Sequence, residues 1–429
     1  MKLPTLNKSL ISKTLTAATL LALSVNAHAE SLAIINATVH TSSVSGVLQN
    51  ASVIIEDGVI VAINPSTVNA DKTIDAKGKI LTPGFIAAFS SLGLVEVGAV
   101  SETRDGGDDK SDIAFDPSLA FNPKTSAIPY SRKGGITRSI IAPSGGKKIF
   151  KGQTSVVNLS GELDSVVYAN NALLVELGSL SKGSRALALQ TLINTLDDAA
   201  EKLEKAQKEK AKASKDKKKD AKDEKTPSRE EKIINAVLSG EKTILITSAH
   251  RASDLLELIK LKQRLNLNMV IEGAGEAIVV ASQLAEAGIP VVINATQALP
   301  GDFDQLHPSL ENAGKLAQAG VKVIIGTRGA HSLNLLRFDA GIAVAYGMTQ
   351  QQALNALTSN IAEAFNLNAG SIEVGTPADL VLWTADPFEL SSRVDTLWID
   401  GKQHTTDSRQ DALRKRYMTK SDMPPAYTK

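Results

Sequence analysis

Short runs of β-branched and alternating apolar residues mark both ends of the chain as β structure. Five such runs predict strands: Leu32–Val39, Ala51–Ile55, Val59–Ile63, Leu380–Trp383 and Val394–Ile399. Glu56-Asp57-Gly58 and Asp400-Gly401 follow strands in the pattern of tight hairpin turns. Two β-rich ends around a long middle predict one small β-sandwich domain assembled from both termini.

The middle of the chain alternates between strand and helix patterns. The predicted strands are Ile136–Ile141, Thr243–Thr247, Asn268–Ile271, Pro290–Asn294 and Val321–Ile325. The predicted helices are Ser253–Leu265, Glu276–Ala287, Leu310–Ala319 and Leu333–Tyr346. Strands that alternate with helices of this length are typical of parallel βα units. The fold class is therefore α/β, and a (β/α)8 TIM-type barrel fits the length of this region.

One segment, residues 201–232, differs from its surroundings because it holds 13 basic and 9 acidic residues. Its first part continues a predicted helix from Arg185 to Lys212, with pairs such as Glu201 and Lys205 one turn apart. Beyond Ser214 the composition is that of a solvated excursion. We interpret the segment as a charged insertion between barrel elements, and a basic contact surface is the alternative.

Residues 1–29 are predicted to be a cleavable signal peptide. A basic start with Lys2, Lys8 and Lys13 precedes the apolar run Leu15–Val25, and Ala27-His28-Ala29 has the small-x-small pattern of a cleavage site. The apolar run has about 11 residues, against the roughly 20 that span a bilayer, which favours cleavage over anchoring. In a bacterium such a signal directs the protein to the periplasm.

The amino-acid composition excludes several kinds of functional site and binding partner. The chain has no cysteine, which excludes disulfides, iron–sulfur clusters, thiolate zinc sites and cysteine nucleophiles. The formal net charge of +1 gives no overall electrostatic reason to bind nucleic acid or an anionic membrane surface. We expect neither a nucleic-acid partner nor membrane insertion.

Several motifs resemble the amidohydrolase superfamily, in its imidazolonepropionase-like branch. The segment Leu81-Thr82-Pro83-Gly84-Phe85-Ile86 resembles the entry into the first barrel strand of that branch. Similar segments stand at the second, fifth, sixth and eighth strands and at the return to the small domain: Gly134–Thr137, Ala249–Ala252, Val270–Glu272, Ala319–Thr327 and Gly370–Leu382. The resemblance implies the domain order: signal peptide 1–29, first part of the β-sandwich 30–81, barrel 82–369, second part of the β-sandwich 370–404 and C-terminal tail 405–429.

The resemblance also implies a metal-dependent hydrolase of carbon–nitrogen bonds, in which zinc or a similar ion activates water. The positions expected to hold the metal carry other residues here. Phe89 and Ser91 stand in place of the His-x-His pair of the first strand, Ser248 and Gly273 in place of histidines of the fifth and sixth, and Arg328 in place of the aspartate of the eighth. These residues do not form a zinc ligand set. We therefore predict no cofactor, with a divalent metal retained only if the ligands are atypical.

Histidines are too few and too scattered for the usual metal site. After the signal peptide the chain holds five: His40, His250, His307, His331 and His404. The candidate pocket residues are Arg328, Glu272, His250 and His331, and no catalytic residue can be assigned. Arg328 could bind the carboxylate of a small ligand, because guanidinium groups bind carboxylates bidentately, or it could pair internally with Glu272.

Two functional hypotheses follow. In the first, the chain is a metal-free, degenerate amidohydrolase that acts as a periplasmic binding or partner protein, alongside an active relative or by self-association. In the second, it is an active hydrolase of amide or cyclic amide bonds with atypical or absent metal ligands. The fold alone does not decide between them, because function is set by the site.

The signal peptide gives a first testable prediction. Cleavage after Ala29 should leave a mature chain that begins at Glu30, because the apolar run is too short to anchor and the cleavage motif follows it directly. Intact-mass measurement of protein from the periplasmic fraction checks this. A mass that retains residues 1–29 would contradict it.

Overall fold

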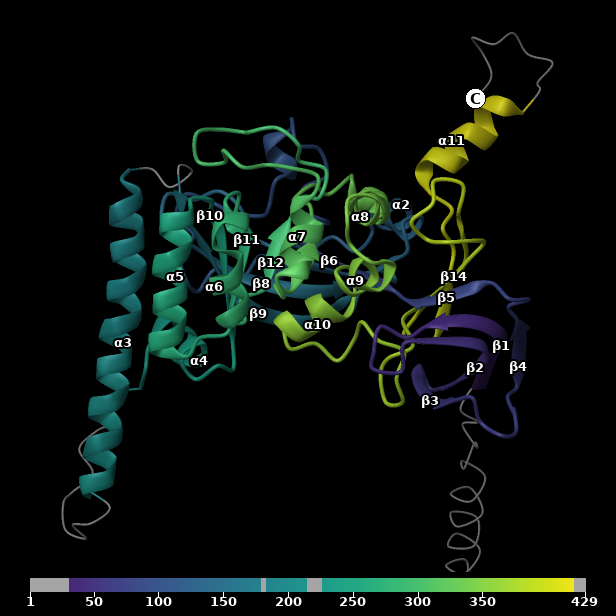
Figure 1. Cartoon of the computed structure of the whole chain (residues 1–429), viewed down its shortest axis with the longest axis horizontal. Helices are drawn as coiled ribbons and strands as arrows, with labels where there is room; N and C mark the ends of the chain where they lie inside the picture. Colours follow the sequence, from purple (N-terminus) through teal and green to yellow (C-terminus); the bar gives the residue numbers. More distant parts are fainter. Residues whose placement is uncertain (1–30, 179–182, 214–225, 420–429) are drawn as a thin grey trace, which may run out of the picture.

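Two eight-stranded sheets organise the chain, one at each side of the junction near residue 84 (Figure 1). The computed structural model describes residues 31–178, 183–213 and 226–419. The predicted signal peptide and the centre of the charged insertion lie outside the described residues.

The first sheet draws its strands from both ends of the chain. Its members are β1 (Ser31–His40), β2 (Val47–Glu56), β3 (Val59–Ile63), β4 (Lys72–Asp75), β5 (Ile80–Pro83), β14 (Leu380–Trp383), β15 (Val394–Ile399) and β16 (Lys402–His404). The order is β16-β15-β14-β5-β1-β2-β3, and β4 pairs with β1. The two ends meet where β5 pairs antiparallel with β14, with Leu81 opposite Leu382. Of the predicted composite β-sandwich, the assembly from both termini is confirmed, and its strands form one continuous sheet.

The two predicted hairpin turns are confirmed, and they pack against each other. Asp57 and Gly58 have φ values of 48° and 81°, and Asp400 and Gly401 have 48° and 75°. These left-handed values are the ones that two-residue hairpins require. A Cβ atom on Gly58 would lie 2.6 Å from the Asp400 carbonyl oxygen, so this close approach requires glycine.

The second sheet is the barrel. Its strands are β6 (Phe85–Ser90), β7 (Ile136–Ile141), β8 (Phe150–Asn158), β9 (Val166–Glu176), β10 (Thr243–Ala249), β11 (Met269–Gly273), β12 (Val291–Ile293) and β13 (Val323–Ile325). They lie side by side in chain order from β6 to β13. The architecture is a TIM-type barrel, and the strands that the motifs marked as first, second, fifth, sixth and eighth are β6, β7, β10, β11 and β13.

Alternate residues of the barrel strands are buried on opposite faces of the sheet. Ile324 of β13 and Leu245 of β10 belong to the core cluster inside the barrel, which also includes Phe365. Their neighbours Val323 and Ile325 belong to the cluster formed with the helices. A strand buried on both faces reads as a continuous apolar run, which explains the β-branched runs in the sequence.

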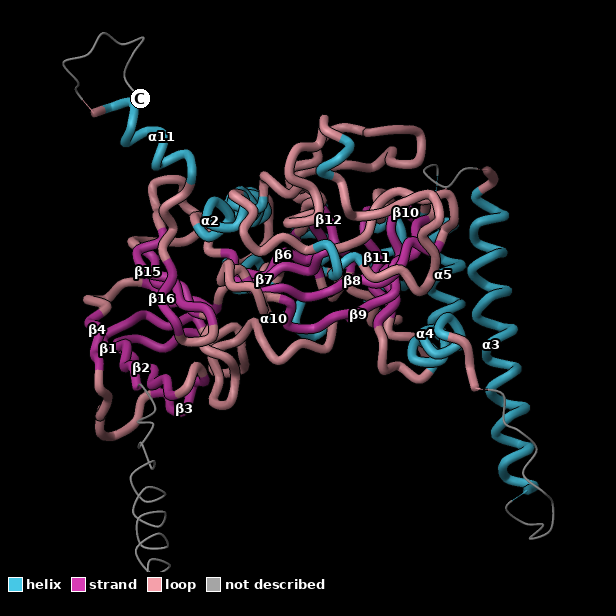
Figure 2. The backbone as a smooth tube through the Cα atoms, turned by 180° about the vertical axis from the view of Figure 1, so that it is seen from behind, coloured by secondary structure: helices cyan, strands magenta, loops and turns pink. Residues whose placement is uncertain are grey.

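Helices cover the outside of the barrel (Figure 2). They are α2 (Ala127–Arg132), α3 (Arg185–Ala213), α4 (Arg229–Leu238), α5 (Ala252–Leu265), α6 (Ala281–Glu286), α7 (Asn312–Gln318), α8 (Leu336–Ala345), α9 (Gln350–Asn355) and α10 (Ser359–Ala364), with α11 (Arg409–Met418) after the small sheet. Short 3-10 turns are η1 (Ser101–Thr103), η2 (Pro117–Ala120), η4 (Ala277–Val280) and η5 (Leu333–Leu335). The helix predicted over Glu276–Ala287 is divided into η4 and α6, at a run of three β-branched residues that disfavours helix.

The (β/α)8 prediction needs one correction. Strand β8 runs antiparallel to both β7 and β9, and the described loops 142–149 and 159–165 on either side of it contain no helix. Short loops can join only antiparallel neighbours, since a parallel pair needs a crossover of a dozen or more residues. The first residues of β8 therefore lie at the same end of the barrel as the last residues of β7 and β9.

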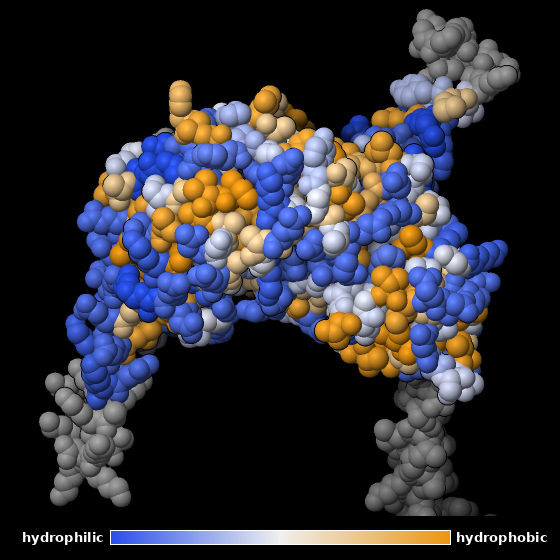
Figure 3. Space-filling model, viewed as in Figure 1, coloured by the Kyte–Doolittle hydropathy of each residue, from blue (hydrophilic) through white to orange (hydrophobic). Residues whose placement is uncertain are grey.

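The charged insertion begins as a helix, as predicted. In α3, Ala188, Leu192 and Leu196 are buried at helical spacing. From Glu201 to Lys208 the side chains are mostly exposed and include the pairs Glu201–Lys205 and Glu204–Lys208. Figure 3 shows hydrophilic surface over this distal part of α3, at the lower left. The apolar stripe ends where the mixed-charge sequence begins, so packing positions only the first half of the helix.

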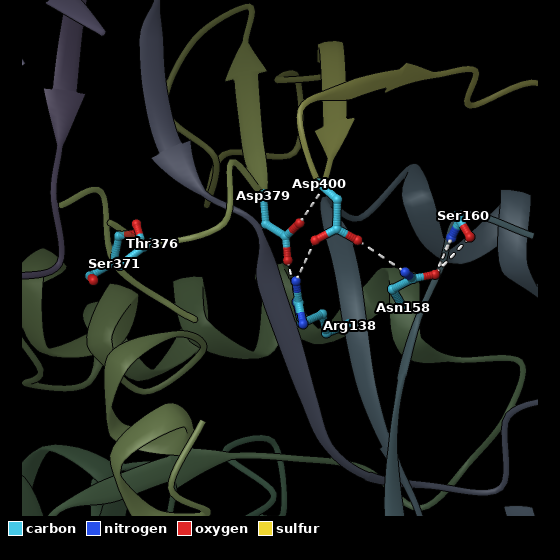
Figure 4. Close-up of polar contacts among 7 residues, drawn as sticks. All are labelled: Arg138, Asn158, Ser160, Ser371, Thr376, Asp379 and Asp400. Carbon is cyan, nitrogen blue, oxygen red and sulfur yellow. Dashed lines mark hydrogen bonds and ion pairs between the residues drawn. The ribbon is translucent and has the colours of Figure 1, made fainter. Parts of the chain in front are cut away.

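A buried ion cluster joins the barrel to the returning C-terminal strands (Figure 4). The guanidinium of Arg138, on β7, donates to Asp379 through Nε and to Asp400 through Nη2, the latter at 2.8 Å. Asn158 Nδ2 donates to the other Asp400 oxygen at 3.1 Å. Burial alone would lower the pKa of Arg138, but the charge and hydrogen bond of Asp379 raise it above its ordinary value.

We expect Arg138→Met to destabilise the fold by about 3–5 kcal/mol, because it leaves the buried Asp379 carboxylate without a counter-ion. Lys79→Met is the matched control. It removes the half-exposed Lys79–Asp395 pair, 2.8 Å long, between the same two halves of the chain. That change should cost less than about 1 kcal/mol. Urea unfolding monitored by circular dichroism measures the loss of stability in both variants. Equal losses would show that the buried Arg138 cluster stabilises the fold no more than the half-exposed Lys79–Asp395 pair.

Candidate functional site

The residues at the predicted metal positions converge at the barrel mouth, defined here as the carboxyl-terminal ends of the parallel barrel strands. Phe89 and Ser91 end β6 and begin the next loop, Ser248 is near the end of β10, Gly273 ends β11, and Arg328 follows β13. Active sites of TIM barrels lie at this end. The motifs therefore identified positions that the fold does bring together.

Arg328 lies at the centre of this group. Its Nε atom donates to Glu272 Oε1 at 3.0 Å, and its Nη2 atom donates to Glu272 Oε2 and, at 3.3 Å, to Ser248 Oγ. The guanidinium carbon lies 5.1 Å from the centre of the Phe89 ring. Of the two alternatives for Arg328, the structure contains the internal bidentate pair with Glu272.

The Arg328 carbonyl oxygen also links β13 and β6, the two strands at the ends of the strand order. It accepts a hydrogen bond from the Ser91 backbone N–H at 3.3 Å, and this contact joins β13 to β6 at the mouth. The Leu357 carbonyl accepts from the Ile86 N–H and the Ala356 carbonyl accepts from the Ile325 N–H, so the segment before α10 bridges the same two strands. The positions of Ser91 and Arg328 are thus set by backbone contacts as well as by side chains.

A second ion pair lies beside the first. Lys151 Nζ, at the start of β8, is 2.9 Å from Glu176 Oε2, at the end of β9. The other Glu176 oxygen lies 3.8 Å from Arg328 Nη1. The mouth therefore contains a chain of alternating charges, Lys151–Glu176–Arg328–Glu272, with no net charge.

The pKa of Arg328 follows from these neighbours. Partial burial by itself lowers it, but the hydrogen bonds and charge of Glu272, with a contribution from Glu176, leave the pKa above its ordinary value. The guanidinium is a permanent cation at any physiological pH. It would repel a divalent ion at the place where the motif resemblance implies an aspartate.

His250 follows β10 and packs against Gly273. A Cβ atom on Gly273 would lie 2.6 Å from His250 Cε1, and the φ of Gly273 is 98°. Burial lowers the pKa of His250, and the charge of Glu272 opposes the shift without cancelling it, so the imidazole is neutral at pH 7. Its buried Nδ1 atom has no hydrogen-bond partner among the described residues.

His331, the remaining pocket candidate, does not join this group. It is exposed, and its Nε2 atom lies 3.1 Å from the Glu96 backbone oxygen in the loop after β6. His307 pairs with Glu276 at 3.2 Å, outside the alternating-charge chain. These two histidines are held by loops of the rim.

The donor set at the mouth does not fit a divalent metal. Phe89 and Gly273 offer no ligand atom, and the guanidinium of Arg328 has only donors. Among residues 31–178, 183–213 and 226–419, no three histidine, aspartate or glutamate side chains are placed to hold a metal ion together. A zinc site needs three or four such ligands.

The mouth contains a cavity of about 190 Å³, referred to here as the mouth cavity. Its polar lining includes Ser91, Lys151, Glu176, Thr247 and Arg328. Sequence analysis did not single out Lys151 or Glu176. Glu176 directly follows the apolar run Leu173-Leu174-Val175, which was a usable signal, whereas Lys151 reaches the mouth because β8 is antiparallel.

Two of the chain's strained backbone positions lie at strand ends of the barrel mouth. Ser248 and Ala274 are non-glycine residues with φ values of 61° and 35°, at the ends of β10 and β11. Such conformations cost about 1–3 kcal/mol each and are found where surrounding structure fixes a functional geometry. At Ser248 the strained backbone carries the hydroxyl that accepts from Arg328.

Fold and site together define a TIM-type barrel whose mouth holds a chain of ion pairs. The sequence profile of the Amidohydrolase family matches residues 173–404, more than half of the chain. The chain therefore belongs to the amidohydrolase family.

Individual relatives agree with this assignment. The imidazolonepropionase of Shouchella clausii (strain KSM-K16) is 35% identical over 132 residues, which is 28% of this chain and 28% of that enzyme. An amidohydrolase from Thermotoga maritima MSB8 is 27% identical, with a TM-score of 0.73 over 87% of this chain and 99% of its own. Enamidase, at 17% identity and a TM-score of 0.52 over 88% of this chain and 97% of its own, shares the fold.

The contact between Gly273 and His250 gives the next prediction. Gly273→Ala should destabilise the protein by about 1–3 kcal/mol more than a control glycine substitution, because the new methyl group overlaps the imidazole ring. Gly375→Ala is the control, since Gly375 has a φ of 91° and open space around its Cβ position. Thermal unfolding measures both variants.

The double variant Gly273→Ala/His250→Ala isolates the overlap. Without the imidazole ring the new methyl group meets no overlap. The double variant should therefore lose only as much stability as His250→Ala and the control Gly375→Ala lose when their effects are added. If the two single changes are simply additive, the imidazole does not lie against Gly273 in solution.

Proposed function

We propose that this chain is a metal-independent member of the amidohydrolase family that does not perform the family's hydrolysis and acts as a binding or partner protein through its barrel mouth. The observation that carries the proposal is the bidentate pair between Arg328 and Glu272 at the convergence of Phe89, Ser248 and Gly273. A fixed guanidinium takes the position that a water-activating cation would need.

Hydrolysis in this family requires a Lewis acid that lowers the pKa of bound water to about 7. The cations of the mouth do not replace that step. Arg328 is a permanent cation with no proton to exchange near neutral pH, and its charge is already balanced by Glu272. Lys151 is likewise paired with Glu176. The charged groups of the mouth therefore stabilise one another.

The retained geometry supports binding. The charge chain connects β8, β9, β11 and the end of β13, so it fixes the relative positions of four strands at the mouth. Side chains locked by ion pairs on strands form a preorganised wall, which lowers the entropy lost when a ligand binds. A family member that has lost its metal can keep such a pocket.

We further propose that the protein acts in the periplasm of a bacterium. The basic start, the short apolar run and the Ala27-His28-Ala29 motif support this location. Among the described residues, no helix has the length and apolar character needed to cross a membrane.

Metal analysis tests the proposal. Protein purified without added metal should contain far less than one equivalent of zinc, manganese or iron by plasma mass spectrometry. A chelator should leave the melting temperature unchanged, because an ion that is not bound contributes no linkage free energy. Arg328→Asp alone should not restore metal binding, since the histidines are still absent.

A defined result of the same metal analysis would overturn the proposal. Tightly held transition metal at about one equivalent per chain, with a chelator that lowers both the melting temperature and an amide hydrolase activity, would replace this proposal with that of an active hydrolase.

A further inference from the structure

We infer that the mouth cavity binds a small monocarboxylate, held between Lys151 and Arg328. The inference rests on the proposed function, because the ligand would occupy space beside the position of the lost metal. It adds a ligand class and names two side chains as the ligand's contacts. Neither Lys151 nor Glu176 stands at one of the metal positions that the motif resemblance implies.

Both cations line the cavity and keep unused hydrogen-bond donors. Arg328 uses Nε and Nη2 for Glu272 and Ser248, and its Nη1 atom has a single charged neighbour, Glu176, at the long distance of 3.8 Å. Lys151 Nζ has three protons and two acceptors, Glu176 at 2.9 Å and the Gly146 carbonyl oxygen at 3.1 Å. Two Nη1 protons and one Nζ proton are therefore left for a ligand.

The charge of the lining selects an anion. The charged residues that line the cavity are Lys151, Glu176 and Arg328, whereas Glu272, which pairs with Arg328, does not line it. Although the four-residue charge chain is neutral, the wall itself presents two cations and one carboxylate, and an anion between Lys151 and Arg328 would contact both cations. Lys151 is only 5% exposed, so its interaction with an anion is weakly screened by solvent.

The apolar residues that line the mouth cavity favour a ligand with a short apolar tail. Phe89, Val95, Ala142, Pro143 and Leu174 line the same cavity. Its volume of about 190 Å³ is below the roughly 300–1,000 Å³ of pockets for drug-sized ligands. A carboxylate with a few carbon atoms therefore matches both the polar and the apolar part.

The first test uses the unmodified mature chain. Isothermal titration in a chloride-free buffer would compare butyrate with butyramide, a neutral ligand of nearly the same size. We expect butyrate to bind and butyramide to bind at least about tenfold more weakly, since hydrogen bonds to charged groups contribute more than neutral ones. Equal affinity for the two ligands, or no butyrate binding at millimolar concentration, would overturn the inference.

Two substitutions should shift the butyrate affinity in opposite directions. Lys151→Met removes a contact and should weaken binding about tenfold or more. Glu176→Gln removes the negative charge from the lining and should strengthen binding. Lys147→Met is the control, because Lys147 is an exposed lysine paired with Asp109 on the rim, and it should leave the affinity unchanged. A purely structural role for Lys151 and Glu176 would make both variants bind more weakly.

The outcomes separate this inference from the proposed function. Metal-free protein that binds butyrate in this pattern supports both. Metal-free protein that does not discriminate butyrate from butyramide overturns the carboxylate site and leaves the metal-independent assignment in place. Stoichiometric metal in the purified chain, with butyrate affinity that disappears with a chelator, overturns both.

Discussion

The guanidinium of Arg138, on the second barrel strand, lies between two carboxylates that come from the far end of the chain. Asp379 immediately precedes β14 and Asp400 is in the turn between β15 and β16, so one buried cluster fixes both to the barrel. The Asp379 carboxylate also accepts the Asp400 backbone N–H at 2.8 Å. An ion buried this deeply must be paired, and the pairing leaves a single way for the C-terminal strands to join the sheet that the N-terminal strands began.

Ion pairs between residues from distant parts of the chain also fix the structure of the barrel mouth. Arg328 and Lys151 are each paired with a glutamate from a neighbouring strand end. These ion pairs occupy the region in which the motif resemblance implies metal ligands. A mouth that balances its own charges is held in shape by the chain's own side chains.

The antiparallel strand β8 connects fold and site. In a regular βα repeat every strand would present its carboxyl end at the mouth, and the first residues of a strand would lie at the opposite end. Reversal of β8 brings Lys151, the second residue of that strand, next to Glu176, the last residue of β9. A change of topology therefore supplies a cation to the site, and this cation has no counterpart among the metal positions.

The sequence alone determined the composite β domain, the hairpin turns at Asp57-Gly58 and Asp400-Gly401, and the strands that carry the family motifs. These features depend on local periodicity, turn chemistry and ordered motifs, all of which are written in short stretches of residues. The sequence also identified Phe89, Ser91, Ser248, Gly273 and Arg328 as a set. It left the partner of Arg328 open and missed Lys151, Glu176 and the Arg138 cluster. Those contacts join residues from distant strands, and Arg138 and Asp379 are 241 positions apart. Their distances depend on strand direction and register, which only the tertiary structure decides.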